Sequence, residues 1–370
     1  MSYKYFVKQF TIIIIFFLIF HIIIYGFTRE ALSLPDKFIK RSIYTGRHEP
    51  LQHVEVTAFG DLARLSYLYR LGVRREVVDT SDEKGFLNKK YGENLVYPVL
   101  TVGDSFMLCN GDDGRFPILL QNQLNTNCYN AAANGVQDPF SFLQSDLIKN
   151  TKVLVWESVE RNISSDSFNV GKIDFYYTES KKKNDYVENW DRKKTYRKQL
   201  EVVNSSNIKF LVNNLWYSIT GKPALDKVDI VKLKNGRELM YFQDDLISFN
   251  KTENFEDVCQ IAEFISYINT QLKAKGITLI FLAVPDKYNA YYGEIVEEQK
   301  IKNDPRFIER LTSELQNRNV IAVNLIDPFR NEINEGRDVY HFDDTHWNNN
   351  GAEIAAELVA REIKKRGLLD

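Results

Sequence analysis

An apolar segment of 18 residues without a formal charge, Phe10–Phe27, lies near the N-terminus of this 370-residue chain. As a helix it would be about 27 Å long, which is close to the hydrocarbon thickness of a bilayer. A signal peptide would normally have a shorter apolar core, and no clear small-x-small cleavage site follows Tyr25. We therefore predict an uncleaved transmembrane anchor at residues 10–27, preceded by a short N-terminal tail at residues 1–9.

The basic residues beside this segment bear on its orientation. Two lysines, Lys4 and Lys8, precede the segment, whereas four basic residues follow it before residue 42. The positive-inside rule applied to this count predicts that the C-terminal part of the chain is cytoplasmic. The function inferred below requires the opposite orientation, and we adopt that one.

Composition excludes several classes of protein. The chain has 48 Lys and Arg against 50 Asp and Glu, a net charge of −2, so it lacks the basic excess typical of nucleic-acid binding. Three cysteines are too few for a disulfide scaffold or a four-thiolate zinc site. With 44% hydrophobic residues, the chain contains enough apolar side chains for a folded core.

Beyond residue 96, short apolar segments alternate with segments of helical periodicity. This alternation is typical of βαβ units and predicts an α/β fold with a parallel central sheet covered on both faces. The predicted strands are Val99–Val102, Cys128–Asn130, Val153–Trp156, Thr278–Val284 and Val320–Asn324, and the predicted helices are Arg115–Leu124, Phe140–Leu147, Glu256–Lys275 and Ala352–Arg366.

The alternation of strand-like and helical segments also suggests domain boundaries. Residues 28–96 lack this alternation and are predicted to be a juxtamembrane stalk, whereas residues 97–370 form the α/β domain. The alternation breaks again at about 162–255, which we interpret as an inserted α+β segment. Within it, two strand-like segments flank Asn235–Gly236, a pair that favours a hairpin with a type I′ turn.

Two motifs at opposite ends of the α/β domain have the residue types of a serine hydrolytic site. Ser105 follows the first strand in Gly103-Asp104-Ser105, where a turn into a helix would expose its hydroxyl. His346 precedes the last helix and follows two acids, Asp343 and Asp344. A serine nucleophile needs a base within hydrogen-bond reach, and the base needs a carboxylate that fixes its tautomer.

These motifs resemble the first and last blocks of the SGNH hydrolase superfamily, whose fold is a three-layer α/β/α, flavodoxin-like one. The string DDTHWNNNGAEIAA is similar to the DxHW signature of SGNH-like O-acetyltransferases that modify cell-envelope polysaccharides, such as the alginate O-acetyltransferases. Two further segments, Val153–Arg161 and Leu282–Tyr292, look like the same group. The order of serine before aspartate and histidine is that of ordinary SGNH enzymes, whereas the alginate enzymes are permuted.

The resemblance implies a role for each site residue. Ser105 is then the nucleophile, His346 the general base and Asp344 its orienting acid, with Asp343 as the alternative acid because it occupies the position used by ordinary SGNH esterases. For the oxyanion hole or substrate, the candidates are Asn134, Gly135 and Arg161. A structural ion pair is an equally open role for Arg161. Trp347 is expected to be a packing residue.

The resemblance also implies a function. It predicts an O-acyltransferase, most simply an O-acetyltransferase, that moves an acyl group through an acyl-serine onto hydroxyls of a cell-envelope polysaccharide. The partners are an acyl donor, the polysaccharide and a multispan membrane acyl-transfer protein, and neither a metal nor a cofactor is required. The expected location is the inner membrane, with a single-pass anchor and a periplasmic or extracellular catalytic domain. An esterase with the same triad and a non-catalytic glycan-binding or assembly protein remain as alternatives.

Overall fold

The computed structural model describes residues 3–28, 47–88, 96–133, 148–174, 205–225, 227–246, 255–301 and 306–370. Within these residues, five parallel strands form the central sheet in the order β4-β3-β5-β8-β9. Their bounds are β3 Val99–Val102, β4 Cys128–Asn130, β5 Val153–Val159, β8 Thr278–Val284 and β9 Ile321–Asn324. Numbered along the chain, this is the 2-1-3-4-5 order of flavodoxin-like sheets. The predicted α/β class with a parallel central sheet is therefore confirmed.

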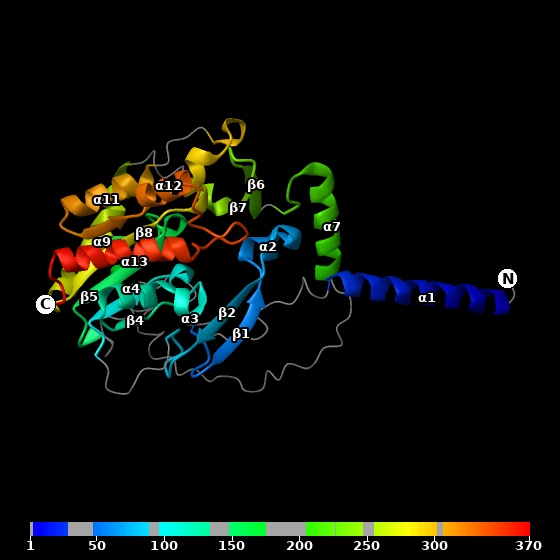
Figure 1. Ribbon diagram of the computed structural model, residues 1–370, viewed down its shortest axis with the longest axis horizontal. Helices are drawn as coiled ribbons and strands as arrows, with labels where there is room; N and C mark the ends of the chain where they lie inside the picture. Colours follow the sequence, from blue (N-terminus) through cyan, green and yellow to red (C-terminus); the bar gives the residue numbers. More distant parts are fainter. Residues whose placement is uncertain are drawn as a thin grey trace.

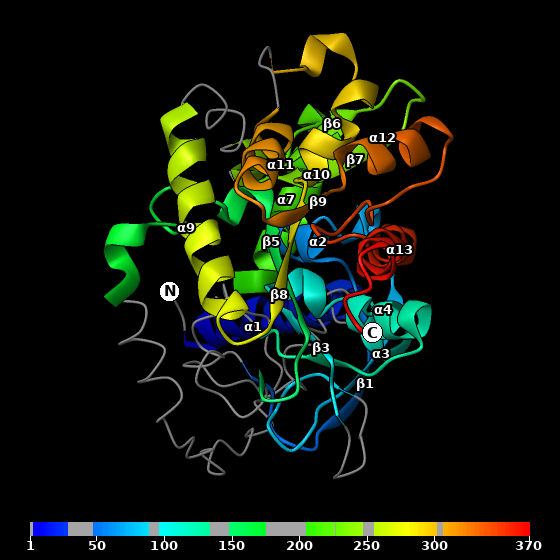
Figure 2. The ribbon, with the colours of Figure 1, turned by 90° about the vertical axis from the view of Figure 1, so that its left-hand side faces the viewer.

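Helices cover both faces of the sheet, which makes three layers (Figures 1 and 2). One face packs against α9 (Phe255–Lys273) and α11 (Phe307–Asn317) through residues such as Leu154 and Phe281. The other face packs against α4 (Phe116–Leu124) and α13 (Asn349–Lys365) through residues such as Val155 and Leu282. The remaining helices of this part are α3 Gly111–Gly114, α10 Lys287–Tyr291 and α12 Ile326–Asn334, with 3₁₀ turns η3 Ser105–Met107, η5 Glu160–Asn162, η6 Val170–Lys172, η8 Tyr292–Glu294 and η9 Glu297–Gln299.

Alternate residues of each strand serve the two cores, because successive side chains point to opposite faces. A strand buried on both sides therefore appears in the sequence as a continuous apolar segment. Both β3 and β8 have the bounds predicted for them, whereas β5 continues three residues further, to Val159, and contains the buried polar residues Glu157 and Ser158. The predicted helix at Phe140–Leu147 lies outside the described residues.

The segment before the sheet contains an antiparallel pair, β1 (His53–Ala58) and β2 (Arg75–Thr80), joined through α2 (Asp61–Ser66) and η2 (Tyr69–Leu71). It is tied to the α/β domain by buried polar contacts. Arg115 Nη2 lies 2.5 Å from Asp79 Oδ1, and the Tyr129 hydroxyl donates to Asp82 Oδ2 over 2.6 Å. The boundary between a stalk and the α/β domain at residue 97 stays a prediction, but residues 47–88 pack directly on that domain.

The predicted inserted segment contains α7 (Ser205–Thr220), the hairpin of β6 (Val228–Lys232) and β7 (Glu238–Phe242), and η7 (Gln243–Leu246). The predicted hairpin is present, but the predicted type I′ turn is wrong. A type I′ turn needs a positive φ at both central residues, and here Gly236 has φ +83° while Asn235 is not in the left-handed region. The Gly236 N–H donates to the Leu233 carbonyl, and Leu233 pairs with Arg237, so the glycine supplies the single left-handed residue of a longer loop.

The N-terminal apolar segment lies within α1, a helix over Tyr3–Thr28 that begins in the predicted tail. In the part of the chain that the structure describes, α1 is the helix long and apolar enough to cross a membrane, with a mean hydropathy of 2.4 over its span. It extends away from the globular part in Figure 1, and its apolar side chains are largely exposed. This arrangement is consistent with a single-pass anchor.

Candidate active site

Ser105 lies directly beyond the carboxyl end of β3, at the point where the strand order reverses. Ligands of open α/β sheets bind at such switch points. Asp104 fixes the turn, because its Oδ1 accepts the N–H of Phe106 over 3.0 Å and its Oδ2 accepts the amide of Asn162 over 2.9 Å. The serine thus begins a 3₁₀ turn that is held by the aspartate before it.

Gly103 allows β5 to approach this turn closely. A Cβ at position 103 would lie 2.3 Å from Glu157 Oε2, the oxygen that accepts the Asp104 N–H over 3.0 Å. Burial, and then the charge of Asp104, raise the pKa of Glu157 well above its usual value. Glu157 is therefore a buried carboxyl beneath the serine turn whose protonated form is favoured, and its Oε2 is hydrogen-bonded.

His346 joins Ser105 to Asp344 in one chain of hydrogen bonds. Its Nε2 lies 2.8 Å from Ser105 Oγ, and its Nδ1 lies 2.6 Å from Asp344 Oδ1. Asp344 also accepts the His346 backbone N–H over 3.0 Å, which holds the two side chains in register. Burial lowers the pKa of His346, but the charge and hydrogen bond of Asp344, together with the charge of Asp61, outweigh burial, and the net pKa is raised. The pKa of Asp344 is held far below its usual value because the charge of His346 and its hydrogen bonds to Asp344 outweigh burial.

Asp343 shares Arg75 with Asp344, whose Oδ2 lies 3.5 Å from Arg75 Nη2, but its other partners differ. Its carboxylate is fully buried, binds Arg75 Nη1 over 2.6 Å, and accepts the backbone N–H groups of Gly60 (3.0 Å) and Val73 (2.8 Å). These contacts hold the segment around α2 against the loop that bears His346. The geometry therefore gives the two adjacent acids different tasks, with Asp344 at the histidine and Asp343 at the packing interface.

Asp61, the first residue of α2, is a site residue that the sequence did not reveal. Its Oδ1 accepts the Thr345 N–H over 2.7 Å, its Oδ2 lies 3.9 Å from His346 Nδ1, and its own N–H donates to Asp344 Oδ2 over 3.1 Å. Burial, and then the charge of Asp344, raise the pKa of Asp61 to about 6. The only signal in the sequence was its position after a glycine, which predicts a turn and nothing more.

Asp61, Asp344 and His346 offer ligand atoms within 4.8 Å of one another, a spacing that a metal site could also show. However, both ring nitrogens of His346 are already engaged, one with Asp344 and the other with Ser105. An ion on His346 would have to break one of those bonds. The hydrogen bonds of a triad therefore account for this cluster.

Lys287 and Trp347 hold in place the loop that bears His346, which we call the histidine loop. The Lys287 ammonium is fully buried and donates to the carbonyl oxygens of Phe342 (2.8 Å) and Asp344 (3.0 Å), and burial lowers its pKa to about 8. The Trp347 ring is fully buried between Phe106 (5.3 Å between centroids) and Phe116 (5.9 Å). Trp347 thus packs the loop against the serine turn.

The candidates for the oxyanion or substrate are only partly described. Arg161 Nη1 binds Asp286 (2.8 Å) and Asp245 (3.3 Å), and its guanidinium lies 5.7 Å from the centre of the Phe106 ring. It is therefore an ion-paired cation next to the serine turn. Asn134 and Gly135 lie outside the described residues, so their predicted role as donors remains a prediction.

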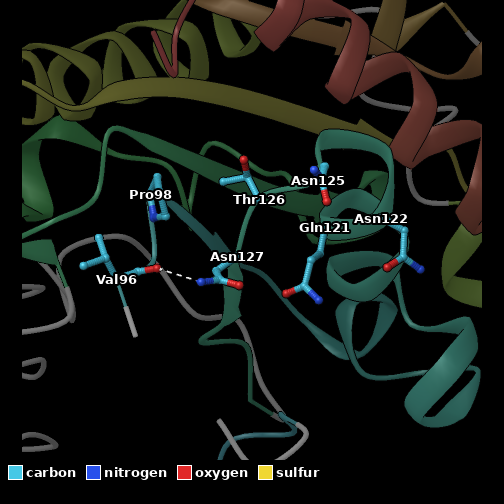
Figure 3. A pocket seen from close by; sticks show the side chains of 7 residues that line it. All are labelled: Val96, Pro98, Gln121, Asn122, Asn125, Thr126 and Asn127. Atoms are coloured by element: carbon cyan, nitrogen blue, oxygen red, sulfur yellow. Dashed lines mark hydrogen bonds between the residues drawn. The ribbon is translucent and has the colours of Figure 1, made fainter. Parts of the chain in front are cut away.

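A hollow of about 510 Å³ lies at the amino ends of β3 and β4 (Figure 3). Its lining includes Pro98 and Asn127, which precede the first residues of β3 and β4, together with amide side chains of α4 and the turn after it, such as Gln121. The triad lies beyond the carboxyl ends of the strands. This hollow is therefore separate from the candidate active site.

Comparison with known proteins supports the resemblance predicted from the motifs. Residues 240–370 match a family model described as an SGNH hydrolase-like domain, acetyltransferase AlgX. The matched part contains Asp344 and His346 but not Ser105. The resemblance to the SGNH superfamily and to alginate O-acetyltransferases is thereby confirmed.

Two curated relatives carry the name "Probable alginate O-acetylase AlgJ". The chain is 28% identical over 158 residues to that of Pseudomonas fluorescens, covering 42% of this chain and 39% of the relative. It is 27% identical over 164 residues to that of Pseudomonas putida, covering 44% and 41%. The matches thus span about two-fifths of the relatives' length. Among solved structures, an acetyl xylan esterase aligns with a TM-score of 0.38 at 11% identity, over 72% of this chain and 98% of the esterase.

Proposed function

We infer that this protein is a membrane-anchored, SGNH-type O-acyltransferase that acetylates hydroxyl groups of a cell-envelope polysaccharide. The observation that carries the inference is the hydrogen-bonded series Ser105–His346–Asp344 at the switch point of the sheet. The names of the two relatives and of the family model support the acetyl group and the polysaccharide as the reactants. An extracytoplasmic catalytic domain, a single-pass anchor in the inner membrane and a multispan partner that supplies the acyl donor belong to the same proposal.

In the first half-reaction, His346 Nε2 takes the proton of Ser105 Oγ as that oxygen attacks the carbonyl carbon of an acyl ester. Asp344 holds the ring in the tautomer that leaves Nε2 free to accept the proton, and it stabilises the imidazolium that results. The tetrahedral intermediate collapses when the leaving oxygen takes the proton from His346. The acyl group is then esterified to Ser105 and the donor departs as an alcohol.

In the second half-reaction, a sugar hydroxyl gives its proton to His346 Nε2 and attacks the acyl-serine carbonyl. Collapse returns the proton to Ser105 and releases the O-acylated sugar. Water in place of the sugar would give an esterase with the same residues. The distinction depends on which acceptor the site binds productively and whether it excludes water.

The backbone N–H of Ser105 is the simplest source of oxyanion stabilisation in the serine turn, because the next two N–H groups already donate to Asp104. Each such donor commonly contributes on the order of 10²–10³ in rate. Asn134 and Gly135 are proposed as the further donors. Arg161 is proposed to contribute positive potential from its ion-paired position rather than a direct bond.

The test uses the full chain purified in detergent with a chromogenic acetyl ester, with and without oligosaccharide acceptors. Ser105→Ala and His346→Ala should each lower ester turnover by on the order of 10³ or more. Ser313→Ala is the matched control, because Ser313 is an exposed serine on α11. Mass spectrometry should find the acetyl group on Ser105 and then, with acceptor present, on the sugar.

The outcomes separate the three functions. Acceptor-dependent acetylated sugar that both variants abolish supports the transferase. Acetate release that no acceptor diverts would assign an esterase instead. A folded parent protein that turns over no ester faster than Ser105→Ala would contradict catalysis and favour a glycan-binding or assembly protein.

A further inference from the structure

Helix α7 packs against the globular part through a mainly polar face, on which the Phe210 ring also lies 5.6 Å from that of Tyr69. The Asn213 amide donates to the Ser66 carbonyl over 3.0 Å, and the Asn214 amide donates to the Tyr67 carbonyl over 2.8 Å. One turn further, the Tyr217 hydroxyl donates to Glu238 over 2.9 Å. Asn213 and Tyr217 are both buried. The polar face of α7 is therefore occupied by the end of α2 and by the β6–β7 hairpin.

The opposite face of α7 is apolar and exposed. Its residues follow the i, i+3, i+4, i+7, i+8, i+11 spacing of one helical face: Ile208, Leu211, Val212, Leu215, Trp216 and Ile219. Trp216 is 50% exposed and Ile219 is 74% exposed. A surface helix of a soluble domain normally has the reverse arrangement, with the apolar stripe facing the core. We call these six residues the α7 stripe.

The position of α7 relates the stripe to the membrane segment. The C-terminal end of α1 lies beside α7 in Figure 1 and the two helices are in contact; Ile24, near that end, is 5% exposed. Figure 1 shows the α/β domain on one side of α7 and α1 extending away on the other. Because the polar face of α7 is turned to the domain, its stripe faces the side on which α1 extends.

We propose that α7 is an interfacial helix whose stripe inserts into the headgroup–acyl boundary of the lipid bilayer that α1 crosses. A helix of this kind has a strong apolar face that includes aromatic residues, and basic rather than acidic flanks. Trp216 lies within the stripe, α7 contains no Asp or Glu, and Lys209 and Lys222 are exposed in or beside it. Tryptophan is enriched at membrane–water interfaces, where its ring contacts lipid and its N–H contacts water.

The proposal requires that α1 spans a membrane, and it is independent of the chemistry at Ser105. The occupant is lipid because the stripe lies beside the end of a predicted span, where a bilayer surface would be the adjacent phase. A soluble protein or a second copy would require the stripe to lie out of lipid. Both arrangements are therefore distinguishable from the proposed one.

The test measures tryptophan fluorescence of the full chain in vesicles of phosphatidylcholine and phosphatidylglycerol, with and without brominated acyl chains, which quench tryptophan on contact. The parent protein is compared with Trp216→Phe. The difference isolates Trp216, because Trp156 and Trp347 are buried in the α/β cores, and any signal of Trp190, which lies outside the described residues, is common to both proteins. We expect bromine-dependent quenching in the parent and loss of most of it in Trp216→Phe.

Equal quenching of the two proteins would show that the stripe lies outside the lipid and would overturn the proposal. A disulfide between copies of an Ile219→Cys variant, together with an unquenched Trp216, would assign the stripe to a second copy and overturn it as well. Flotation of the vesicles tests the anchor separately, and ester turnover tests the catalytic proposal separately. Failure of either of these is therefore distinguishable from failure of the interfacial helix.

Discussion

Asp61 and Asp344 are 283 positions apart in sequence, and the backbone N–H of Asp61 donates to Asp344 Oδ2 over 3.1 Å. The other carboxylate oxygen of Asp344, Oδ1, faces His346. The Asp61 carboxylate in turn accepts the N–H of Thr345, the residue between Asp344 and His346. The loop that bears the proposed base is therefore held by a helix from the segment that precedes the sheet. Asp61 is a positioning residue in this arrangement, since it acts through the histidine and its loop.

Replacing Asp61 with asparagine should change the pH dependence of activity. The asparagine side chain can still accept the Thr345 N–H, but the substitution removes a negative charge that raises the pKa of His346. The acidic limb of the kcat/KM profile, which requires neutral His346, should therefore move to lower pH. At pH 8 we expect kcat to stay within about tenfold of the parent, because Asp344 still orients the ring. An unmoved acidic limb would contradict this role.

The same substitution should raise stability at alkaline pH. Because the folded-state pKa of Asp61 is raised to about 6 from 3.8, the folded protein binds the proton more tightly than the unfolded chain does. The carboxylate therefore costs stability above pH 6, and this cost disappears as the pH falls toward 3.8. Thermal unfolding should show Asp61→Asn more stable than the parent at pH 8 and equal to it near pH 4. A constant difference across this range would show that charge is not the cause.

Asparagine at the two adjacent acids should have different effects. Asp344→Asn should leave folding intact and lower kcat by on the order of 10³–10⁴, because the wrong tautomer of His346 is then favoured. Asp343→Asn should lower the free energy of unfolding by about 1–3 kcal/mol, since it weakens the hydrogen bonds of a fully buried carboxylate with Arg75 and with two backbone N–H groups. Kinetics and denaturant unfolding on both variants provide the comparison. The reverse pattern, a stable but inactive Asp343→Asn, would exchange the two assignments.

An added methyl group at Gly60 should be costly. Its Cβ would lie 2.0 Å from the backbone oxygen of Asp343, so either α2 or the histidine loop must move. Overpacking of this kind costs about 1–3 kcal/mol, and here kcat should fall as well because the loop bears His346. Gly293→Ala is the matched control, because its added Cβ meets nothing within 4 Å. Equal melting temperatures for the two variants would show that this contact is not tight.

Glutamine should replace Glu157 with little effect at neutral pH. The raised pKa favours the protonated carboxyl, which glutamine resembles, and the glutamine oxygen can still accept the Asp104 N–H. We expect activity within about threefold of the parent. Glu157→Ala should instead cost about 1–3 kcal/mol, because it leaves the buried Asp104 N–H without that partner. Calorimetry of both variants at pH 7 tests this, and a large loss in Glu157→Gln would mean that the carboxyl is ionised.

The sequence predicted the central sheet well, because its strands are buried on both faces and appear as continuous apolar segments. The bounds of Val99–Val102 and Thr278–Val284 match those of β3 and β8. The α7 stripe was equally periodic in the sequence, but a periodic pattern indicates a helix without indicating which face the core covers. Only the structure shows that the apolar face of α7 points away from the domain.

The candidate site shows the limit of reasoning from local patterns. Ser105, Asp344 and His346 were singled out because each lies in a short motif, and the structure brings these three side chains together. Asp61 lies in no such motif, and Glu157 lies in the family-like segment Val153–Arg161 without having been given a role there. Their roles come from close approaches between segments that are far apart in sequence, through Gly60 in one case and Gly103 in the other. A single sequence does not encode such approaches in any local signal.

Helix α2 is six residues long, about 9 Å from end to end. Asp61 at its start donates its N–H to Asp344 in the loop that bears His346, and the Ser66 carbonyl at its end accepts the Asn213 amide of α7. With the α7 stripe in lipid, α2 would fix the distance between Ser105 and the bilayer surface and keep that distance short. If the proposed acetylation takes place there, the sugar hydroxyls that reach Ser105 would be those of polysaccharide lying close to the membrane surface.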